Sequence, residues 1–599
     1  MVQDGIQAFV DLLPKDPNTG KPNWCEGIAY SDTGLTSLFD KAFFMANPNL
    51  KSEDDYAIQC AYMTGIREIY KRAAEKMGAV TVNQKTGDTK INSDGITLPK
   101  EIAPDSIALI LLKKYDFINV NYCNRNEADV DECDLGVYIT DGPDRGIYST
   151  SESAIRRIIR PYRSNMGKTK LNDLIQTLKD YAPVVSRTGL QPGEEDLIPC
   201  NNGIFNFKTK EFFDFSPKYV FTWKTRVDYN PNAINKHFTR KNGEDWSFWP
   251  WLVDLMSGAE EDAHAILNML TFVLRPFSPN HKAFFLFSQS KGNAGKGVIA
   301  DTFCRILGES AVESITLAKI GDRFALTNIP KRCLVLGDDN DYNDFIDTSE
   351  VFKTMCTSGS MNIDRKFKDP LNCRPYLTMM ELMNSLPRFS DHSDAMWRRI
   401  YALEMFRSFV EGVDEDKAIG TVFLKDKDVL EFILWMTLNR PYITDMPETK
   451  NSKASLEAIM DVNAPILRFT RMLVQDLEQK DWTSYPAKGA YDLYEAWYDN
   501  EYNGDRKYRI QSATKFKIEM AAALEHTDWV MYPNRTFSVK PEQMPAYMDK
   551  ELTLPEILGA KRFYHSQTRE YYCLPLRDPF GPDVWFIQSY SGIIARKGA

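Results

Sequence analysis

The sequence predicts a multidomain α/β protein built around a mainly parallel sheet. The chain has 599 residues, which is more than one compact domain usually holds. Hydrophobic residues make up 43% and charged residues 26%, an ordinary globular composition that excludes a largely disordered chain. Between residues 282 and 406 short apolar runs alternate with helical patterns, which is typical of domains with a parallel sheet.

Charge and cysteine usage exclude several classes of protein. The chain carries 73 basic and 83 acidic residues, a net charge of −10, so any DNA contact must come from local basic clusters. Its 10 cysteines include no CxxC pair, which argues against zinc sites and a dense disulfide framework. No apolar stretch is long enough for a membrane span, and the N-terminus lacks a basic signal-peptide region. We therefore expect a soluble, cytoplasmic protein without a membrane partner.

Changes in composition and periodicity divide the chain into six expected parts. The first is mostly helical and carries no recognisable site, and the second begins with β-like runs. The expected parts are a helical N-terminal part (1–104), an α+β part (105–240), a helical part (241–280), the α/β domain with the parallel sheet (281–410), a helical segment (411–462) and a C-terminal part (463–599). In the fourth part the expected strands are 283–287, 333–336, 376–380 and 400–403.

The first of these strands runs into a loop rich in small residues, and an apolar helical stretch follows. This order suits a phosphate-binding loop, because backbone N–H groups can wrap phosphates at a helix N-terminus. Lys296 is placed to reach the terminal phosphates of ATP. Ser290 replaces the usual first glycine, and Gly297 replaces the usual hydroxyl ligand of Mg²⁺. Such a loop also joins a strand to a helix in domains without nucleotide. The expected nucleotide-binding residues are Ser290, Gly292, Asn293, Ala294, Gly295, Lys296 and Gly297.

Polar residues follow the later strands at positions that suit ATP hydrolysis. Asp338 and Asp339 end an apolar strand, and we assign Asp338 to Mg²⁺ and Asp339 to the attacking water. Asn384 follows the next strand and could contact the γ-phosphate. Either Arg398 or Arg399 could act as an arginine finger in a neighbouring subunit. Each element alone also occurs in sheets with no catalytic role.

Together these elements resemble a superfamily 3 helicase, and more narrowly the phage and plasmid primase-helicase group that includes the poxvirus nucleoside triphosphatase. The resemblance covers residues 107–406 and rests on the loop, the acidic strand end, Asn384 with Pro387 and Asp391, and the arginine pair. It implies an AAA+-type ATPase core, a helical collar at 241–280 and a C-terminal winged helix. It also implies a hexamer that hydrolyses ATP between subunits and translocates 3′ to 5′. Gly297 departs from the pattern, because the family has Ser or Thr there.

Three basic segments are candidate DNA contacts. Arg365, Lys366 and Lys368 match the pore hairpin of superfamily 3, although flanking aspartates also suit a solvated turn. A cationic run spans residues 156–170, where a solvated helix face is an equal alternative. Lys515 and Lys517 lie near the start of a helix in the expected winged-helix part.

The leading interpretation is an ATP-dependent replicative DNA helicase and initiator of a phage or other mobile element, acting in the host cytoplasm. Its expected partners are single- and double-stranded DNA, including a replication origin, with loader or replisome proteins as further candidates. One alternative adds primase activity, with Asp129, Asp131 and Asp134 holding metal ions. Another is a non-catalytic scaffold that binds an origin, which Gly297 and the missing first glycine favour.

Overall fold

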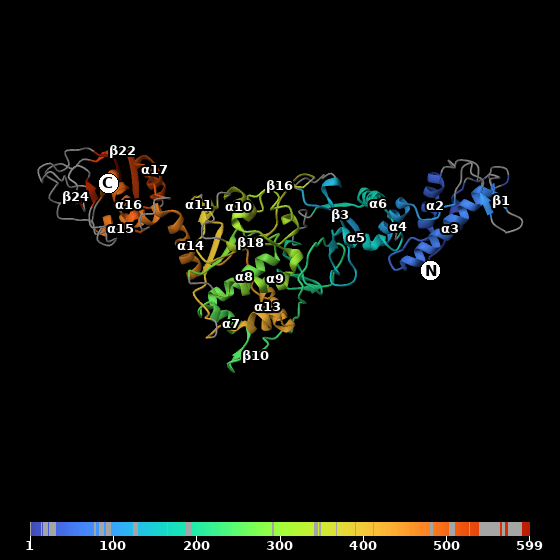
Figure 1. Cartoon of the computed structure of the whole chain (residues 1–599), viewed down its shortest axis with the longest axis horizontal. Coiled ribbons are helices and arrows are strands. Elements are labelled where there is room, and N and C mark those ends of the chain that lie inside the picture. The colour runs from blue at the N-terminus through green and yellow to red at the C-terminus, as the bar shows by residue number, and fades with distance from the viewer. Residues whose placement is uncertain are drawn as a thin grey trace.

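The computed structural model describes residues 2–13, 15, 19, 22, 32–76, 80–82, 89–91, 98–123, 130–163, 166–186, 194–278, 280–289, 293–340, 345–346, 349–366, 368–389, 391–410, 413–479, 483–501, 509–525, 527–537, 563–565, 570–572 and 590–598. The N-terminal helices and the C-terminal unit lie at opposite ends of an elongated molecule, and the largest sheet lies between them (Figure 1). Within the described residues, no helix is long and apolar enough to cross a membrane.

Helices before and after residue 104 share one hydrophobic core, which extends from Phe9 to Ala182. They pack beside a four-stranded sheet with the order β5-β4-β3-β6. The helices are α1 (Ile6–Leu12), α2 (Asp32–Ala46), α3 (Asp55–Lys76), α4 (Pro104–Lys114), α5 (Glu152–Ile159) and α6 (Lys168–Tyr181). The strands are β1 (Val80–Val82) and β2 (Thr89–Ile91), which pair with each other, and β3 (Phe117–Asn121), β4 (Asp134–Tyr138), β5 (Tyr148–Ser149) and β6 (Val184–Ser186).

A buried ion pair anchors the following segment to the helices beneath the central sheet. Arg275 and Asp196 are at most 1% exposed, and Arg275 Nε donates a 2.9 Å hydrogen bond to Asp196 Oδ1. The guanidinium carbon lies 4.6 Å from the ring centre of Phe207. Removing one partner of such a pair would leave an uncompensated buried charge. The short strands here are β7 (Leu197–Pro199), β8 (Ile204–Asn206), β9 (Phe212–Phe213), β10 (Phe238–Thr239) and β11 (Asp245–Trp246).

The central sheet has five parallel strands in the order β13-β14-β18-β12-β20, which confirms the predicted mixed α/β fold with a parallel sheet. The strand expected at 283–287 forms with those bounds, whereas the one expected at 333–336 continues to Asn340 and includes both aspartates. The edge strand β13 was not predicted, because its three residues are only partly buried and form no apolar run. The strands are β12 (Ala283–Phe287), β13 (Val312–Ser314), β14 (Leu334–Asn340), β18 (Thr378–Met383) and β20 (Ile400–Glu404).

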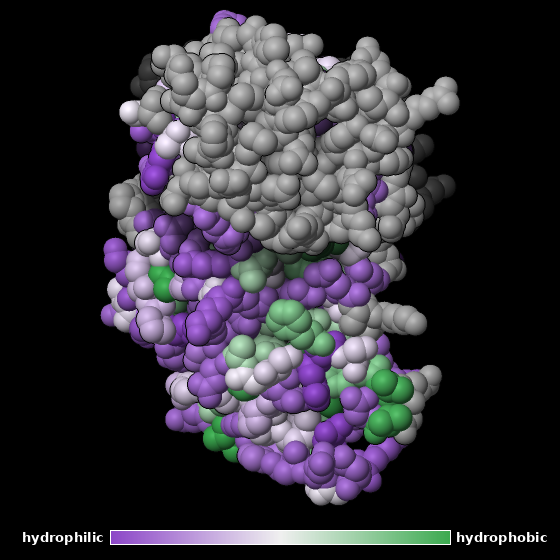
Figure 2. Space-filling view, turned by 90° about the vertical axis from the view of Figure 1, so that its left-hand side faces the viewer, coloured by the Kyte–Doolittle hydropathy of each residue, from purple (hydrophilic) through white to green (hydrophobic). Residues whose placement is uncertain are grey.

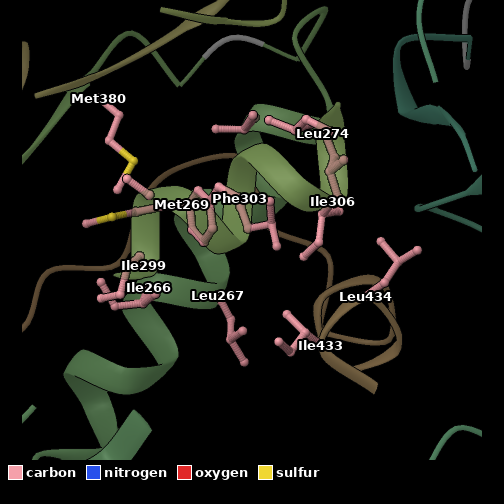
Figure 3. Close-up of a cluster of buried hydrophobic side chains, with 14 of the residues drawn as sticks. Ile266, Leu267, Met269, Leu274, Ile299, Phe303, Ile306, Met380, Ile433 and Leu434 are labelled. Atoms are coloured by element: carbon pink, nitrogen blue, oxygen red, sulfur yellow. The ribbon is translucent and has the colours of Figure 1, made fainter. Parts of the chain in front are cut away.

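Helices cover both faces of this sheet. On one face, α8, α9 and α13 pack their apolar side chains together and against Met380 of β18 (Figure 3). Each fully buried Ile or Phe in this layer contributes about 1.5–3 kcal/mol, so the start of α9 is firmly placed. On the other face, α10 and α14 contribute Phe352 and Ile459 to a second core. The helices are α7 (Phe248–Leu255), α8 (Glu260–Leu274), α9 (Lys296–Leu307), α10 (Ser349–Cys356), α11 (Asp394–Trp397), α12 (Lys417–Thr421), α13 (Lys427–Leu438) and α14 (Lys450–Asn463).

The C-terminal unit has its own aromatic core, which includes Phe469, Tyr494, Trp497 and Phe516. Its three-stranded antiparallel sheet has the order β21-β25-β22. On the side of the molecule that faces the viewer in Figure 2, the described surface is mostly hydrophilic, with small separate apolar patches. The elements are α15 (Pro465–Gln479), β21 (Ser484–Pro486), α16 (Ala487–Glu501), α17 (Ala513–Ala523), β22 (Trp529–Phe537), β23 (Phe563–His565), β24 (Glu570–Tyr572) and β25 (Tyr590–Arg596).

Candidate nucleotide site

The loop after β12 approaches α7 so closely that a glycine is needed at its end. Gly295 caps α9 with a left-handed φ of 82°. A Cβ atom at this position would lie 2.6 Å from Leu255 Cδ1, a distance that no ordinary packing allows. The preceding Ala294 is also buried. This tight turn leads into α9 after the carboxyl end of β12, and the N-terminus of a helix at such a position is suited to bind phosphate.

Asn293 ties the loop to the segment that follows β20. Its side-chain Nδ2 donates a 2.9 Å hydrogen bond to the Phe409 carbonyl. The Phe409 amide in turn donates to the Asn293 carbonyl at 3.0 Å. Asn293 has a left-handed φ of 52°, a conformation that asparagine tolerates better than most residues. The Asn293 side chain thus holds the loop in place from its outer side. Two other residues of the predicted set, Ser290 and Gly292, are not among the residues that the structure describes.

Lys296 and Asn384 meet at the carboxyl edge of the sheet. Lys296 Nζ donates a 2.9 Å hydrogen bond to Asn384 Oδ1. The parallel pairing of β12 with β18 aligns Phe287 with Met383, so the segments that leave these two strands start side by side. Only 8% of Lys296 is exposed. Burial lowers the pKa of its ammonium, and the negative charge of Asp338 acts in the opposite direction.

The acidic strand end contributes one exposed carboxylate near this lysine. Asp338 is exposed and close enough to influence the Lys296 charge. Asp339 continues β14, but its side chain lies outside the described residues. The apolar residues Leu334–Leu336 form the first part of β14, and Gly337 follows them. The strand then continues for three more residues to Asn340, which carries Asp338 and Asp339 to this edge.

A buried glutamate beside the acidic strand end was not predicted. Glu381 lies in the middle of β18, pairs in register with Gly337 and is 0% exposed. A Cβ atom on Gly337 would lie 1.8 Å from Glu381 Oε2, so the glycine makes room for the carboxyl group. The only available signal was a single charged residue within the apolar run Thr378–Met383.

These residues fit ATP and Mg²⁺. Mg²⁺ in nucleotide sites commonly takes one or two protein carboxylates together with phosphate oxygens and water, and Asp338 could serve as one such carboxylate. No group of three or more potential metal ligands exists among the described residues, so a metal ion held by protein side chains alone is not indicated there. Gly297 has open space around the position of a Cβ atom, so packing does not require a glycine at this site.

A groove of about 1170 Å³ opens beside the loop. Trp251 and Leu255 of α7 and Phe409 supply apolar surface, and Val298 lines it from the first turn of α9. Arg407 also lines the groove and forms a 2.9 Å ion pair with Asp254. The groove is therefore large enough for a nucleoside and lies directly next to the predicted phosphate loop, because Asn293 and Gly295 also line it.

The arginine pair lies at the opposite edge of the sheet. Arg398 and Arg399 precede β20, and β20 is parallel to β12, so they lie at the amino edge whereas the loop leaves the carboxyl edge. Arg398 is exposed. Arg399 is half-buried and donates to the Ala395 carbonyl. Burial raises the pKa of the Cys356 thiol, and the Arg399 charge partly opposes this rise, which places Arg399 near that buried cysteine.

The predicted basic hairpin forms from β16 (Met361–Arg365) and β17 (Lys368–Cys373). Arg365 Nε donates a 3.0 Å hydrogen bond to the Asp369 carbonyl, and Lys366 Nζ lies 5.9 Å from the ring centre of Phe324. The Lys368 side chain lies outside the described residues.

The loop that carries Phe324 was not predicted as part of this surface. Phe324 has a left-handed φ of 76°, a strained conformation for an aromatic residue. Arg323 beside it is exposed and forms a 2.9 Å ion pair with Asp364 of the hairpin. In the sequence, the only indication of this loop's role was the adjacent basic and aromatic pair Arg323 and Phe324. Sequence spacing could not show that this pair lies next to the hairpin.

The two C-terminal lysines point in different directions. Lys515 is exposed near the start of α17, where its amide donates to Ser512 Oγ at 3.2 Å. Lys517 is half-buried, and its Nζ lies 3.2 Å from the position of a Cβ atom built on Gly592 of β25. Lys515 can therefore reach an external partner, whereas Lys517 lies against the sheet.

Comparisons with known proteins connect two parts of the chain to family models. The family described as "D5 N terminal like" matches residues 108–253, which lie within the part of the chain, residues 107–406, that carries the resemblance to the primase-helicase group. A family of unknown function, DUF5906, matches residues 288–399, which hold the loop, the acidic strand end and the arginine pair. A comparison with curated proteins finds no match.

Solved structures of the NrS-1 C-terminal region match over much of the chain at low similarity. One apo form is 14% identical, covers 75% of this chain and 90% of that one, and has a TM-score of 0.39. Another, of residues 305–718, is 15% identical, covers 72% and 88%, and has a TM-score of 0.38.

Proposed function

We propose that the chain is an ATP-driven DNA helicase of the superfamily 3, AAA+ type that initiates replication of a phage or other mobile element. The observation that carries the proposal is the hydrogen bond between Lys296 and Asn384, which joins the predicted phosphate loop to the predicted γ-phosphate contact. A partly buried ammonium paired with a neutral amide at a sheet edge is suited to bind an anion.

Each group has a defined task in ATP hydrolysis. The N–H groups at the start of α9 and Lys296 bind the phosphates, and the groove at Trp251 and Phe409 receives base and ribose. Mg²⁺, which Asp338 would hold, neutralises phosphate charge when bound. Asn384 orients the γ-phosphate and water, and Asp339 is the candidate base for that water.

The position of the arginines supports hydrolysis between subunits. Because Arg398 lies at the amino edge of the sheet, it cannot reach the loop of its own chain. A head-to-tail contact with a second copy would bring it to that copy's nucleotide, and repetition of this contact closes a ring, for which we propose a hexamer. Its exposure makes Arg398 the better candidate for the finger than Arg399.

Two surfaces are suited to DNA. Arg365 and Lys366 of the hairpin, together with Arg323 and Phe324, combine cations with an aromatic side chain, as single-strand binding requires. The C-terminal unit follows the order helix, strand, helix, helix, strand, strand in its main sheet, which supports a winged helix with Lys515 at the start of α17. We propose that this unit contacts duplex DNA at an origin, or a loader or replisome protein.

The proposal is tested by ATP hydrolysis with and without single-stranded DNA, for the wild type, Lys296→Ala and the hairpin double variant Arg365→Gln/Lys366→Gln. We expect turnover that DNA stimulates, that disappears in Lys296→Ala, and that loses only its DNA stimulation in the hairpin variant. A folded, oligomeric wild type without turnover would contradict the helicase proposal and favour the non-catalytic scaffold.

A primase-helicase is supported equally by the D5 N-terminal-like match. Among its three candidate carboxylates, Asp134 Oδ2 forms a 2.7 Å ion pair with Lys331 Nζ, which occupies it without a metal ion. Asp129 lies outside the described residues, as does the side chain of Asp131. Synthesis of labelled primers from ribonucleotides or deoxyribonucleotides on a single-stranded template would decide between the two, and product formation would favour the primase-helicase.

A further inference from the structure

We propose that α5 and α6 form a third nucleic-acid surface, separate from the hairpin and the C-terminal unit, which binds the phosphate backbone of duplex DNA. The surface consists of Arg157 and Arg160 at the end of α5 and Lys168 and Lys170 at the start of α6, and we call it the α5–α6 cationic surface. The inference rests on the proposed function only in taking DNA as the polyanion.

The local sequence is exceptional for this acidic chain. Residues 153–172 contain six basic residues and no acidic residue, although the chain as a whole carries 83 acidic and 73 basic residues. Protein surfaces ordinarily mix the two signs, and a field of one sign is typical of surfaces that bind a polyanion.

Among the described residues, two of the six basic side chains in this run form contacts with acidic side chains, and the other four do not. Arg156 Nε donates a 2.9 Å hydrogen bond to Glu152 Oε1, and Arg163 pairs with Glu101. The four residues of the α5–α6 cationic surface are exposed. Within the part of the chain that the structure describes, none of these four side chains forms an ion pair. They can therefore neutralise phosphates without breaking an existing contact.

Both helices hold these cations on a rigid support. Ile155 and Ile159 anchor α5, and Leu171, Leu174 and Leu178 anchor α6, in the same core. The apolar residues lie three or four positions apart and form the buried face of each helix, whereas the four cations lie at exposed positions outside that face.

The surface belongs to a unit that also contacts the basic hairpin. The backbone of Cys123, which follows β3, forms an isolated antiparallel β-bridge with the backbone of Cys373 at the end of β17. The positive charge of Arg365 also influences the pKa of Cys123, although burial is the larger influence and raises it. The segment of DNA that extends beyond the hairpin would therefore lie within reach of this unit.

The chemistry favours a duplex backbone over single strands. The α5–α6 cationic surface contains four cations and no aromatic residue, and the nearby Tyr162 is buried. Single-strand binding usually adds stacking of bases on aromatic side chains, whereas cations alone contact phosphates without reading sequence.

The test measures binding of a fluorescent 30-base-pair duplex by anisotropy at several salt concentrations, without nucleotide and with the full chain. The variants are Arg157→Gln/Arg160→Gln on α5 and Lys168→Gln/Lys170→Gln on α6. The matched control is Arg156→Gln/Arg163→Gln, which removes the same charge from the same run but at paired positions. Each phosphate contact contributes about 0.9 to the slope of log affinity against log salt.

We expect each test variant to bind the duplex several-fold more weakly and to reduce the salt slope by about 2, with a smaller change in the control. Equal losses in all three variants would show a general charge effect and overturn the proposal, as would unchanged binding in both test variants. Vesicles of phosphatidylcholine with phosphatidylserine form a further arm. Binding to them that is lost in the test variants, with duplex binding retained, would assign the surface to a membrane instead. Because no ATP is present, these outcomes are independent of whether hydrolysis occurs.

Discussion

Lys296 Nζ lies 2.9 Å from Asn384 Oδ1, although the two residues are 88 positions apart in the chain. The lysine begins the helix that follows β12, and the asparagine follows β18, the neighbouring parallel strand. The amide oxygen accepts a hydrogen bond from a lysine that is only 8% exposed. Phosphate oxygens would take over this role, because they carry full negative charge.

This contact predicts different consequences for two substitutions of Asn384. Asn384→Ala should retain ATP binding but lower turnover by about 100-fold, because loss of one preorganised polar contact in the transition state typically costs that much. Asn384→Asp should weaken ATP binding itself, since its carboxylate would hold Lys296 in an ion pair and repel phosphate. Binding of a fluorescent ATP analogue together with steady-state turnover separates the two effects. Equal affinities for ATP in the two variants would refute this role of the contact.

Gly297 predicts a gain of function. A side chain at this position meets open space, and glycine inside a helix costs about 1 kcal/mol relative to alanine. Gly297→Thr should restore the usual hydroxyl ligand and lower the Mg²⁺ concentration needed for half-maximal ATP hydrolysis. Gly297→Ala is the control, because it stabilises the helix without adding a ligand. If both variants show the same Mg²⁺ dependence, the hydroxyl has no role at this site.

Mixing of inactive variants tests the assignment of Arg398. Lys296→Ala and Arg398→Ala should each be inactive alone, whereas a mixture should regain part of the turnover. Mixed rings place an intact Arg398 beside an intact Lys296 of the adjacent subunit. An arginine that acts within its own chain would give no recovery. Arg399→Ala should instead lower the melting temperature, because that side chain is half-buried near Cys356.

Asp40 predicts that stability of the N-terminal helices depends on pH. Burial raises the pKa of this carboxyl group from 3.8 to about 6, although hydrogen bonds from Tyr62 and Ser106 partly oppose the rise. A raised pKa in the folded state favours the protonated form. Its stabilisation is therefore complete below pH 4 and is lost as the pH rises through 6. Two pKa units correspond to about 3 kcal/mol.

Hydrogen exchange in α2, α3 and α4 provides the measurement for this prediction. Asp40→Asn removes the titration. The ratio of amide protection in the variant to that in the wild type should therefore increase between pH 5 and pH 8. The comparison is made at each pH, because intrinsic exchange rates also change with pH. A constant ratio between the two proteins across this range would show that Asp40 does not titrate there.

Much of the central sheet could be predicted because its strands are buried on both faces. Strands of this kind read as continuous apolar runs, and β12 formed with the expected bounds. β13 was not predicted, because it is an edge strand whose residues are partly exposed and form no continuous apolar run. Glu381 also escaped, since a single charge inside an apolar strand indicates neither its burial nor the space above Gly337.

The order of motifs along the chain was sufficient to propose ATP chemistry, because phosphate binding requires a strand, a loop of small residues and a helix in that sequence. Only the tertiary structure decided which of the motifs meet. Parallel pairing brings Lys296 and Asn384 to one edge and carries Arg398 to the opposite edge. Likewise, ion pairs with distant acids decide which members of the 156–170 run remain available. These relationships depend on strand order and on contacts between residues far apart in the chain, neither of which local periodicity encodes.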